Sequence, residues 1–238
     1  MATSAHPTPV YEERYVLFAD MLGFKNIIRE GRWRPGRIVS ALAKARDVTE
    51  PDYEAMRTTQ FSDSIVMSAP VDDLGFLNLV YAAFFLSIEL VQNGILMRGG
   101  IARGALYHDG NFVFGPAFLD AYAPEQCANT PRILVENGLF ESARWPETMS
   151  EEEIAEVSRY HLPRDEDNQR YVDYFSHHHV DEFDAGANGL RAHYEALDAM
   201  IERYMVSTDE RIVSKYRWVA AKLAVARERM RAQWGEPD

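Results

Sequence analysis

Over its first 136 residues the chain alternates short apolar runs with amphipathic stretches, a pattern typical of a mixed α/β domain. Residues 14–20 form a nearly unbroken apolar run, which is typical of a strand buried on both faces. The pattern first predicts a strand over 14–20, helices over 21–30 and 38–48, and a two-strand hairpin over 53–68. A helix over 74–92 follows and stops at Asn93-Gly94, and strands over 95–104 and 105–114 come next, with a turn at Asp109-Gly110. The last elements of this part are a helix from Pro116 to about residue 127 and a strand over 131–135.

The pattern changes beyond Glu136. A charged helix is expected over 149–160, a strand over 169–175, and two long helices over 189–204 and 209–234. The sequence contains no internal repeat and no low-complexity tract. We therefore predict three parts: a loose tail over 1–12, an α/β domain over 13–136, and a mainly helical extension over 137–238 that packs on the domain or on a dimer interface.

The composition indicates a globular protein with a packed core. Of the 238 residues, 47% are hydrophobic and 12% are aromatic. The formal net charge of −12 disfavours a general nucleic-acid binder and a binder of anionic membranes. Cys127 is the only cysteine, which excludes an intramolecular disulfide and fits a reducing cytosol, and we expect it to be a buried structural thiol.

Two segments bear on localisation. Residues 1–9 lack the basic start and the apolar run of a signal peptide. The longest apolar stretch, residues 77–91, carries Asn78, Ser87 and Glu89 and is expected to be too short and too polar to span a bilayer. We therefore expect a cytoplasmic protein with no membrane partner and no nucleic-acid partner.

Two aspartates stand at the tips of predicted apolar strands. Asp20 ends the first strand, and Asp63 lies at the turn of the hairpin, 43 residues later. A carboxylate that ends a hydrophobic strand points out of the core, so the two are expected to meet across adjacent strands and share divalent metal ions. Oxygen-bound Mg²⁺ or Mn²⁺ keeps coordination positions open for phosphate oxygens, which is the chemistry of nucleoside triphosphates. The alternatives are a helix N-cap for Asp20 and a turn residue that bonds its own backbone for Asp63.

Three stretches resemble the class III nucleotidyl cyclase domain. They are Phe18–Phe24 (FADMLGF), Phe61–Ser64 (FSDS) and Met97–Gly104 (MRGGIARG). Further segments resemble a bacterial branch, the Pycsar pyrimidine cyclases, which make a cyclic pyrimidine nucleotide as an antiphage signal. These segments are Arg98–Ile101, Phe114–Ala117, Ala121-Tyr122 and Pro131–Ile133. The resemblance covers residues 14–136.

The resemblance implies an α/β (α+β) fold, the ferredoxin-like class III nucleotidyl cyclase fold, for a catalytic domain over 13–136, working as a homodimer with composite active sites. It implies two Mn²⁺ or Mg²⁺ ions held by Asp20, Asp63 and the backbone carbonyl of Met21. One ion would activate the ribose 3′-hydroxyl, and the other would hold the triphosphate and neutralise the departing pyrophosphate. The implied activity is that of a phosphorus–oxygen lyase that converts UTP to 3′,5′-cyclic UMP. CTP is the alternative substrate, and a catalytically silent module that binds nucleotide is the alternative function.

The chain departs from ordinary adenylyl cyclases at four positions. The base-selecting Lys of those enzymes corresponds to Thr59, and its partner Asp falls near Phe112. The Asn and Arg that stabilise the transition state fall near Leu119 and Ala123. These departures disfavour a purine substrate, and they require some other cation near the phosphates.

Strand alternation indicates which residues accompany Thr59 as substrate-binding candidates. In a regular strand, Arg57 and Thr59 share a face with Phe61 and Asp63. Arg57 is therefore expected to point into the nucleotide pocket. A second candidate is Arg98, which stands beside two glycines that allow close backbone approach.

Three further features carry weaker expectations. Arg103 is a third candidate cation, and Tyr53 is expected to stack on a base, with ordinary core packing as its alternative. The run 177–179 consists of three histidines. Because neighbouring strand residues point to opposite faces, consecutive histidines rarely converge on one ion, so we expect a solvated run.

Overall fold

The computed structural model describes residues 10–29, 55–109, 111–127 and 130–234, together with Gly36, Val39 and Ala43. Val39 and Ala43 are helical, in the region of the helix predicted over 38–48. The rest of that predicted helix lies outside the described residues.

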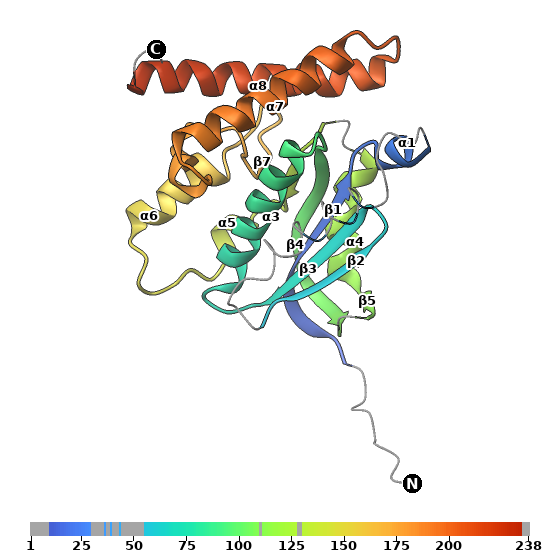
Figure 1. The fold of residues 1–238 in the computed structure, drawn as a ribbon. Coiled ribbons are helices and arrows are strands. Elements are labelled where there is room, and N and C mark those ends of the chain that lie inside the picture. Colours follow the sequence, from blue (N-terminus) through green and yellow to red (C-terminus); the bar gives the residue numbers. More distant parts are fainter. Residues whose placement is uncertain are drawn as a thin grey trace.

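A seven-stranded sheet forms the centre of the fold (Figure 1). Its strands are β1 (Glu12–Met21), β2 (Arg57–Phe61), β3 (Ser64–Pro70), β4 (Met97–His108), β5 (Val113–Phe114), β6 (Ile133–Val135) and β7 (Arg170–Tyr171). Their order is β2-β3-β1-β4-β6-β7, with β5 paired to β4. The first four strands are all antiparallel to their neighbours and run β2-β3-β1-β4, which is the order of the ferredoxin-like split βαβ motif. The predicted ferredoxin-like α/β fold is confirmed.

Helices cover both faces of this sheet. The helices of the first part are α1 (Phe24–Arg29), α3 (Gly75–Gln92) and α4 (Pro116–Cys127). Figure 1 shows α3 on one side of the sheet and α4 on the other. Tyr15 and Leu17 of β1 belong to the core on the α3 side, whereas Val16 and Phe18 belong to the smaller core under α4. The first strand is therefore buried on both faces, as its unbroken apolar run predicted.

Strand β4 runs without a break through the position where two strands were predicted to meet. Gly104 lies inside it, and its role is close packing rather than a turn, since a Cβ at this position would lie 3.5 Å from the Cβ of Ala117 on α4. Gly100 is tighter, since a Cβ there would lie 2.8 Å from the carbonyl oxygen of Ala121. The predicted turn comes after the strand, where the Asp109 carboxylate accepts from the backbone N–H of Phe112 at 2.8 Å.

Among the described residues, one helix is long and apolar enough to cross a membrane, by length and composition alone. This helix is α3, which has 18 residues, so the expectation that the segment is too short and too polar was wrong in both parts. In the structure it is a core helix, with Phe76, Leu79 and Phe84 fully buried.

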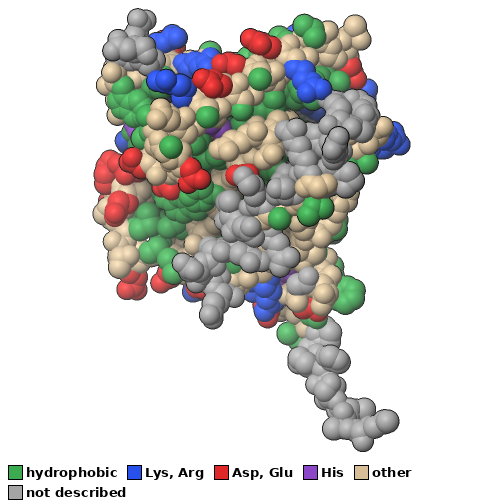
Figure 2. Space-filling model, viewed as in Figure 1, with side chains coloured by type: hydrophobic (Ala, Val, Ile, Leu, Met, Phe, Trp, Pro, Cys, Tyr) green, Lys and Arg blue, Asp and Glu red, His purple; other side chains and the backbone are tan. Residues whose placement is uncertain are grey.

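The extension beyond Glu136 contributes both helices and a strand. Its elements are α5 (Leu139–Ser142), α6 (Glu151–Glu156), a π-helical turn (Val157–His161), β7, a 3-10 helix (His177–Glu182), α7 (Ala187–Met205) and α8 (Glu210–Trp234). Strand β7 pairs with β6, so the sheet continues into the extension. The strand predicted over 169–175 is reduced to two residues. Figure 2 shows basic side chains along the α7–α8 hairpin and acidic side chains over α6.

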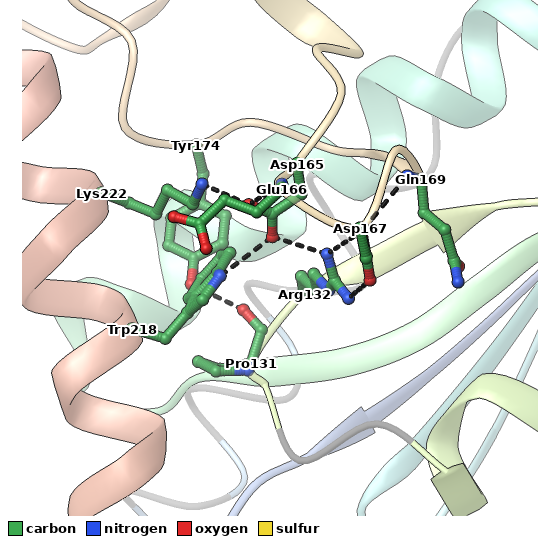
Figure 3. Close-up of polar contacts among 9 residues, drawn as sticks. All are labelled: Pro131, Arg132, Asp165, Glu166, Asp167, Gln169, Tyr174, Trp218 and Lys222. Carbon is green, nitrogen blue, oxygen red and sulfur yellow. Dashed lines mark hydrogen bonds and ion pairs between the residues drawn. The ribbon is translucent and has the colours of Figure 1, made fainter.

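A buried arginine joins the end of the α/β domain to the extension (Figure 3). Arg132, just before β6, donates to Asp165 at 2.5 Å and also forms an ion pair with Asp167. Asp165 in turn accepts from the indole N–H of Trp218 at 2.9 Å and pairs with Lys222, both on α8. The network therefore links β6, the loop before β7, and the last helix.

His178 is the exposed member of the histidine run, and the expectation of a solvated run is wrong for His177 and His179. His177 and His179 are 1% and 3% exposed, because the run forms a 3-10 helix under α8 rather than an exposed strand. His179 contacts the ring of Phe84 and its Nε2 lies 2.9 Å from the carbonyl oxygen of Tyr160. His177 bonds the side chain of Gln233 on α8. In the part of the chain that the structure describes, no group of three or more His, Cys, Asp or Glu side chains is arranged to hold a metal ion.

Candidate active site

Asp20 and Asp63 come together at one end of the sheet. Strand β1 pairs with β3 so that Asp20 lies opposite Ser64, the residue after Asp63. The backbone N–H of Met21 donates to the carbonyl oxygen of Asp63 at 2.9 Å. The β2–β3 turn therefore closes directly on the end of β1, with Ser62 in the left-handed conformation at φ 57°. The backbone at Asp20 is therefore adjacent to that at Asp63, and the sharing of metal ions by their carboxylates stays a prediction.

Two side chains in the described part of the chain contact the carboxylate of Asp20. The Ser64 hydroxyl donates to its Oδ1 at 3.3 Å, and the guanidinium of Arg98 lies 3.4 Å from its Oδ2. The side chains of Asp20 and Arg98 are 16% and 24% exposed, so the pair is only partly shielded from solvent. Arg98 is therefore positioned beside the carboxylate that sequence reasoning chose as a metal ligand.

The oxygen atoms at this end of the sheet suit a hard divalent cation. Asp20 and Asp63 each offer a carboxylate. Met21 follows Asp20 and its N–H bonds the backbone of Asp63, so its own backbone carbonyl is a third oxygen ligand to consider. Mg²⁺ and Mn²⁺ prefer such oxygen ligands and accept waters or phosphate oxygens at their remaining positions. Two carboxylates are too few to enclose an ion, which leaves room for a phosphorylated substrate to complete the coordination.

Arg57 and Thr59 lie in a second polar cluster on the same face of the sheet. Arg57 donates to the backbone carbonyl of His108 and lies 3.3 Å from Glu12. The Thr59 hydroxyl lies 2.9 Å from Nε2 of His108. Arg57 is opposite Ser68 in the pairing of β2 with β3. It is therefore four residues from the level of Asp20, or about 13 Å along the strands.

Hydrogen bonding in this second cluster fixes the protonation of His108. The Ser68 hydroxyl oxygen accepts from Nε of Arg14 at 2.9 Å and lies 2.8 Å from Nδ1 of His108. Ser68 is completely buried, so its hydroxyl proton needs an acceptor within the protein, and Nδ1 of His108 provides one. Burial, and after it the charges of Arg14 and Arg57, lower the pKa of His108 to about 4, which keeps the ring neutral. Nε2 then carries the proton and donates to Thr59.

The structure separates the predicted residues into two groups. Asp20, Asp63, Met21 and Arg98 lie together at one end of the sheet. Arg57 and Thr59 share a face, as alternation predicted, and meet His108. Asp63 is not part of that strand, because β2 ends at Phe61.

Two other candidates have different outcomes. Arg103 pairs with Glu13 at 3.2 Å, away from the aspartates. Tyr53 lies outside the described residues.

Sequence reasoning missed three residues near these clusters. His108 would have followed from alternation if β4 had been predicted as one strand, since Arg98 and His108 are an even number of residues apart. Ser64 begins β3, opposite Asp20. Lys215 on α8 is coupled electrostatically to Asp20 and Arg98. No local sequence signal marks it, because the contact joins opposite ends of the chain.

The four family positions at which the chain departs are now placed. Leu119, on α4, is 63% exposed, and Phe112 is 66% exposed. Ala123 also lies on α4. These residues supply no polar group to the site, in contrast to Thr59.

No protein-family model and no curated protein matches this chain. Solved structures with a similar arrangement are cyclase domains. A guanylyl cyclase domain of the RhoGC fusion protein from the aquatic fungus Blastocladiella emersonii is 17% identical, with a TM-score of 0.47 over 69% of this chain and 96% of that one. A bacterial light-regulated adenylyl cyclase is 10% identical, with a TM-score of 0.49 over 83% of this chain and 60% of that one.

A third solved structure is a class III adenylyl cyclase-like ATP-binding protein from Pseudomonas aeruginosa. It is 15% identical, with a TM-score of 0.44 over 79% of this chain and 40% of that one. All three scores are below 0.5, so the functional proposal below rests on the residues of this chain.

Proposed function

We propose that this protein is a metal-dependent pyrimidine nucleotide cyclase that converts UTP to 3′,5′-cyclic UMP and pyrophosphate. The observation that carries the proposal is the meeting of Asp20 and Asp63, where the backbone of Met21 bonds that of Asp63 at 2.9 Å. Two carboxylates, one at a strand end and one in the adjacent turn, suit ions shared with a triphosphate, whose oxygens would supply further ligands.

In this proposal each residue has a distinct task. Asp20 and Asp63, with the carbonyl of Met21, would hold two Mn²⁺ or Mg²⁺ ions, which when bound activate the ribose 3′-hydroxyl and offset the charge of the triphosphate. Arg98 would leave Asp20 to contact the phosphates once ions neutralise that carboxylate. The 3′-oxygen attacks the α-phosphorus, the bond to the pyrophosphate oxygen breaks, and the hydroxyl proton leaves to solvent.

The preference for uracil follows from the direction of the hydrogen bonds at Thr59. Thr59 occupies the position of the base-selecting Lys in the family that the chain resembles. Its oxygen accepts from His108, so its proton is not donated to that ring, and a bound base with a carbonyl oxygen would compete for it. Uracil presents a carbonyl oxygen at position 4, whereas cytosine presents an amino group, which is a donor. UTP is therefore the proposed substrate and CTP the alternative.

The resemblance also supports a homodimer and a role in Pycsar antiphage signalling. Apolar side chains are exposed on α4 and on the segment that leads into it, and a second subunit that completes the site would cover them. Phe112, Phe114 and Leu119 are 66%, 47% and 63% exposed. A partner subunit that covers them would bring its own residues to the nucleotide.

A silent nucleotide-binding module is the second candidate. It is favoured by one observation, which is that α4 carries Leu119 and Ala123 where the transition-state Asn and Arg are expected. Such a module would bind a triphosphate at Asp20 and Asp63 without converting it.

The test is to incubate the purified protein with Mn²⁺ and each of ATP, GTP, CTP and UTP separately, and to identify the products by mass. We expect cyclic UMP from UTP, and loss of nearly all turnover in Asp63→Asn. The matched control is Asp72→Asn, a carboxylate in another turn that caps α3 by accepting from Gly75 at 2.8 Å. Bound nucleotide without any cyclic product would favour the silent module.

A further inference from the structure

The C-terminal hairpin, formed by α7 and α8, lies across the end of the sheet where β1 ends and β4 begins (Figure 1). Helix α7 packs against α3. A cavity of about 450 Å³ is lined by Ile27 of α1, Gly94 after α3, and Arg203 and Tyr204 at the end of α7. The turn of the hairpin is therefore next to the segment that leads into β4 and Arg98.

Aromatic stacking fixes the start of α8 at this place. The rings of Tyr204 and Tyr216 stack with their centroids 4.4 Å apart and their planes inclined by 15°. Both rings also pack against the main hydrophobic core. Lys215, the neighbour of Tyr216, is half-buried as a result. Its position is set by packing rather than by a flexible surface segment.

Lys215 lies among charged side chains of both signs, and cations outnumber carboxylates there once Lys215 itself is counted. Its ammonium interacts electrostatically with Arg98 and Arg211, and with Asp20 and Asp209 of opposite sign. Burial lowers the pKa of Lys215, and the two arginines lower it further than the two aspartates raise it. Within the part of the chain that the structure describes, Lys215 forms no ion pair.

A partly buried cation beside other cations indicates a place prepared for an anion. The whole chain has a formal net charge of −12, so a local excess of positive charge runs against its average. Arg98 and Lys215 approach the Asp20 end of the sheet from different elements, β4 and α8. An anion with several oxygens, such as a polyphosphate, would satisfy both.

We propose that Lys215, carried by the C-terminal hairpin, binds the phosphates of the substrate together with Arg98 and supplies the positive charge that α4 lacks. This inference rests on the proposed function, which places a triphosphate at Asp20 and Asp63. It gives the C-terminal hairpin a direct part in the site. Lys215 would stabilise the pyrophosphate as the bond to the α-phosphorus breaks.

The test is calorimetric titration of the full chain with inorganic tripolyphosphate in the presence of Mn²⁺. Lys215→Met is expected to weaken binding about tenfold, which is the effect of losing one charge-assisted contact. Lys215→Arg, which keeps the charge, is expected to bind within a few-fold of the wild type. The control is Arg217→Met on the same helix, since Arg217 is 60% exposed and paired with Glu210.

A second variant separates this inference from the proposed function. If Asp63→Asn weakens tripolyphosphate binding while Lys215→Met leaves it unchanged, the role of Lys215 is overturned and the metal site stands. If Lys215→Met weakens binding and Asp63→Asn does not, the hairpin binds phosphate without the two-metal site. A thermal melt of each variant by circular dichroism excludes unfolding as the cause. An equal loss in Arg217→Met would also overturn the inference.

Discussion

Arg98 and Asp20 are direct cross-strand partners, opposite each other in the pairing of β1 with β4, with the guanidinium 3.4 Å from the carboxylate. Two residues that face each other in an antiparallel ladder have side chains on the same face of the sheet. The register of β1 against β4 therefore places the two side chains next to each other. A cation that binds Asp20 therefore competes with Arg98 for that carboxylate.

Removing Arg98 should change metal and phosphate binding in opposite directions. In Arg98→Met we expect Mn²⁺ to bind about tenfold more tightly, because a competing positive charge is gone, and tripolyphosphate to bind about tenfold more weakly. Both are measured by calorimetry. Arg103→Met on the same strand, which loses only a partly exposed pair with Glu13, should change neither. Equal Mn²⁺ affinity in Arg98→Met and the wild type would contradict the competition.

The two glycines of β4 that face α4 should differ in their tolerance of a methyl group. Gly100→Ala is expected to lower the free energy of unfolding by about 1–3 kcal/mol, because its Cβ would lie 2.8 Å from the carbonyl oxygen of Ala121. Gly104→Ala should be nearly neutral, since the nearest atom lies at 3.5 Å. The free energy of unfolding of each variant is measured by urea unfolding. An equal loss in the two variants would show that α4 does not pack more closely on Gly100 than on Gly104.

Arg132 should be important for stability. Arg132→Met leaves Asp165 and Asp167 without their shared partner, and we expect a loss of about 3 kcal/mol in the free energy of unfolding. Arg211→Met removes an exposed pair with Asp209 and should leave the urea midpoint unchanged. A midpoint in Arg132→Met equal to that of the wild type would mean that the network adds nothing to the junction.

Acid should begin to destabilise the protein at a pH well above the pH range in which carboxylates titrate. Burial lowers the pKa values of His161 and His193 to about 4, and burial together with the charge of His161 lowers that of His179 to about 3. In the unfolded chain these side chains titrate near about 6.5. Between the two values the unfolded state binds more protons, so stability falls as the pH drops from about 6.5 toward 4.

Each of these histidines contributes about 1.4 kcal/mol per pH unit over that interval. Asp173 offsets one of them, because burial raises its pKa to about 6 and the folded state then holds the extra proton. The check is the urea midpoint measured at intervals from pH 7.5 to 4.5. A flat profile over this interval would rule out the neutral buried histidines.

The protonation of His108 can be read directly. We expect nitrogen NMR to show the neutral form with the proton on Nε2, persisting down to a pH of about 4. Ser68→Ala removes the donor to Nδ1 and should shift the population toward the other tautomer. If Nδ1 carries the proton in the wild type, the hydroxyl of Thr59 is the donor to His108 and the stated preference for uracil loses its basis.

Local hydrophobic patterns in the sequence were sufficient to predict the strand ends that carry Asp20 and Asp63. The apolar run before Asp20 and the hairpin before Asp63 located both aspartates, because each is the end of a strand in the sheet core. The division of β4 into strands over 95–104 and 105–114 was wrong, because the strand continues through Gly104, whose lack of a side chain accommodates α4. His177 owes its surroundings to Gln233 of α8, and Lys215 interacts with Asp20 and Arg98 from the other half of the chain, so no local pattern could place them.

The pairing of β7 with β6 has a consequence for anyone who wishes to work with a shorter chain. A fragment cut at Glu136 would end just after β6 and lose the strand that covers its outer edge. The uncovered edge would present unpaired N–H and C=O groups, which recruit strands from other molecules. Arg132, buried at 7% exposure, would at the same time lose both of its carboxylates. Such a fragment is expected to aggregate, so a useful truncation must retain the sequence through β7 and the helix that carries Lys222.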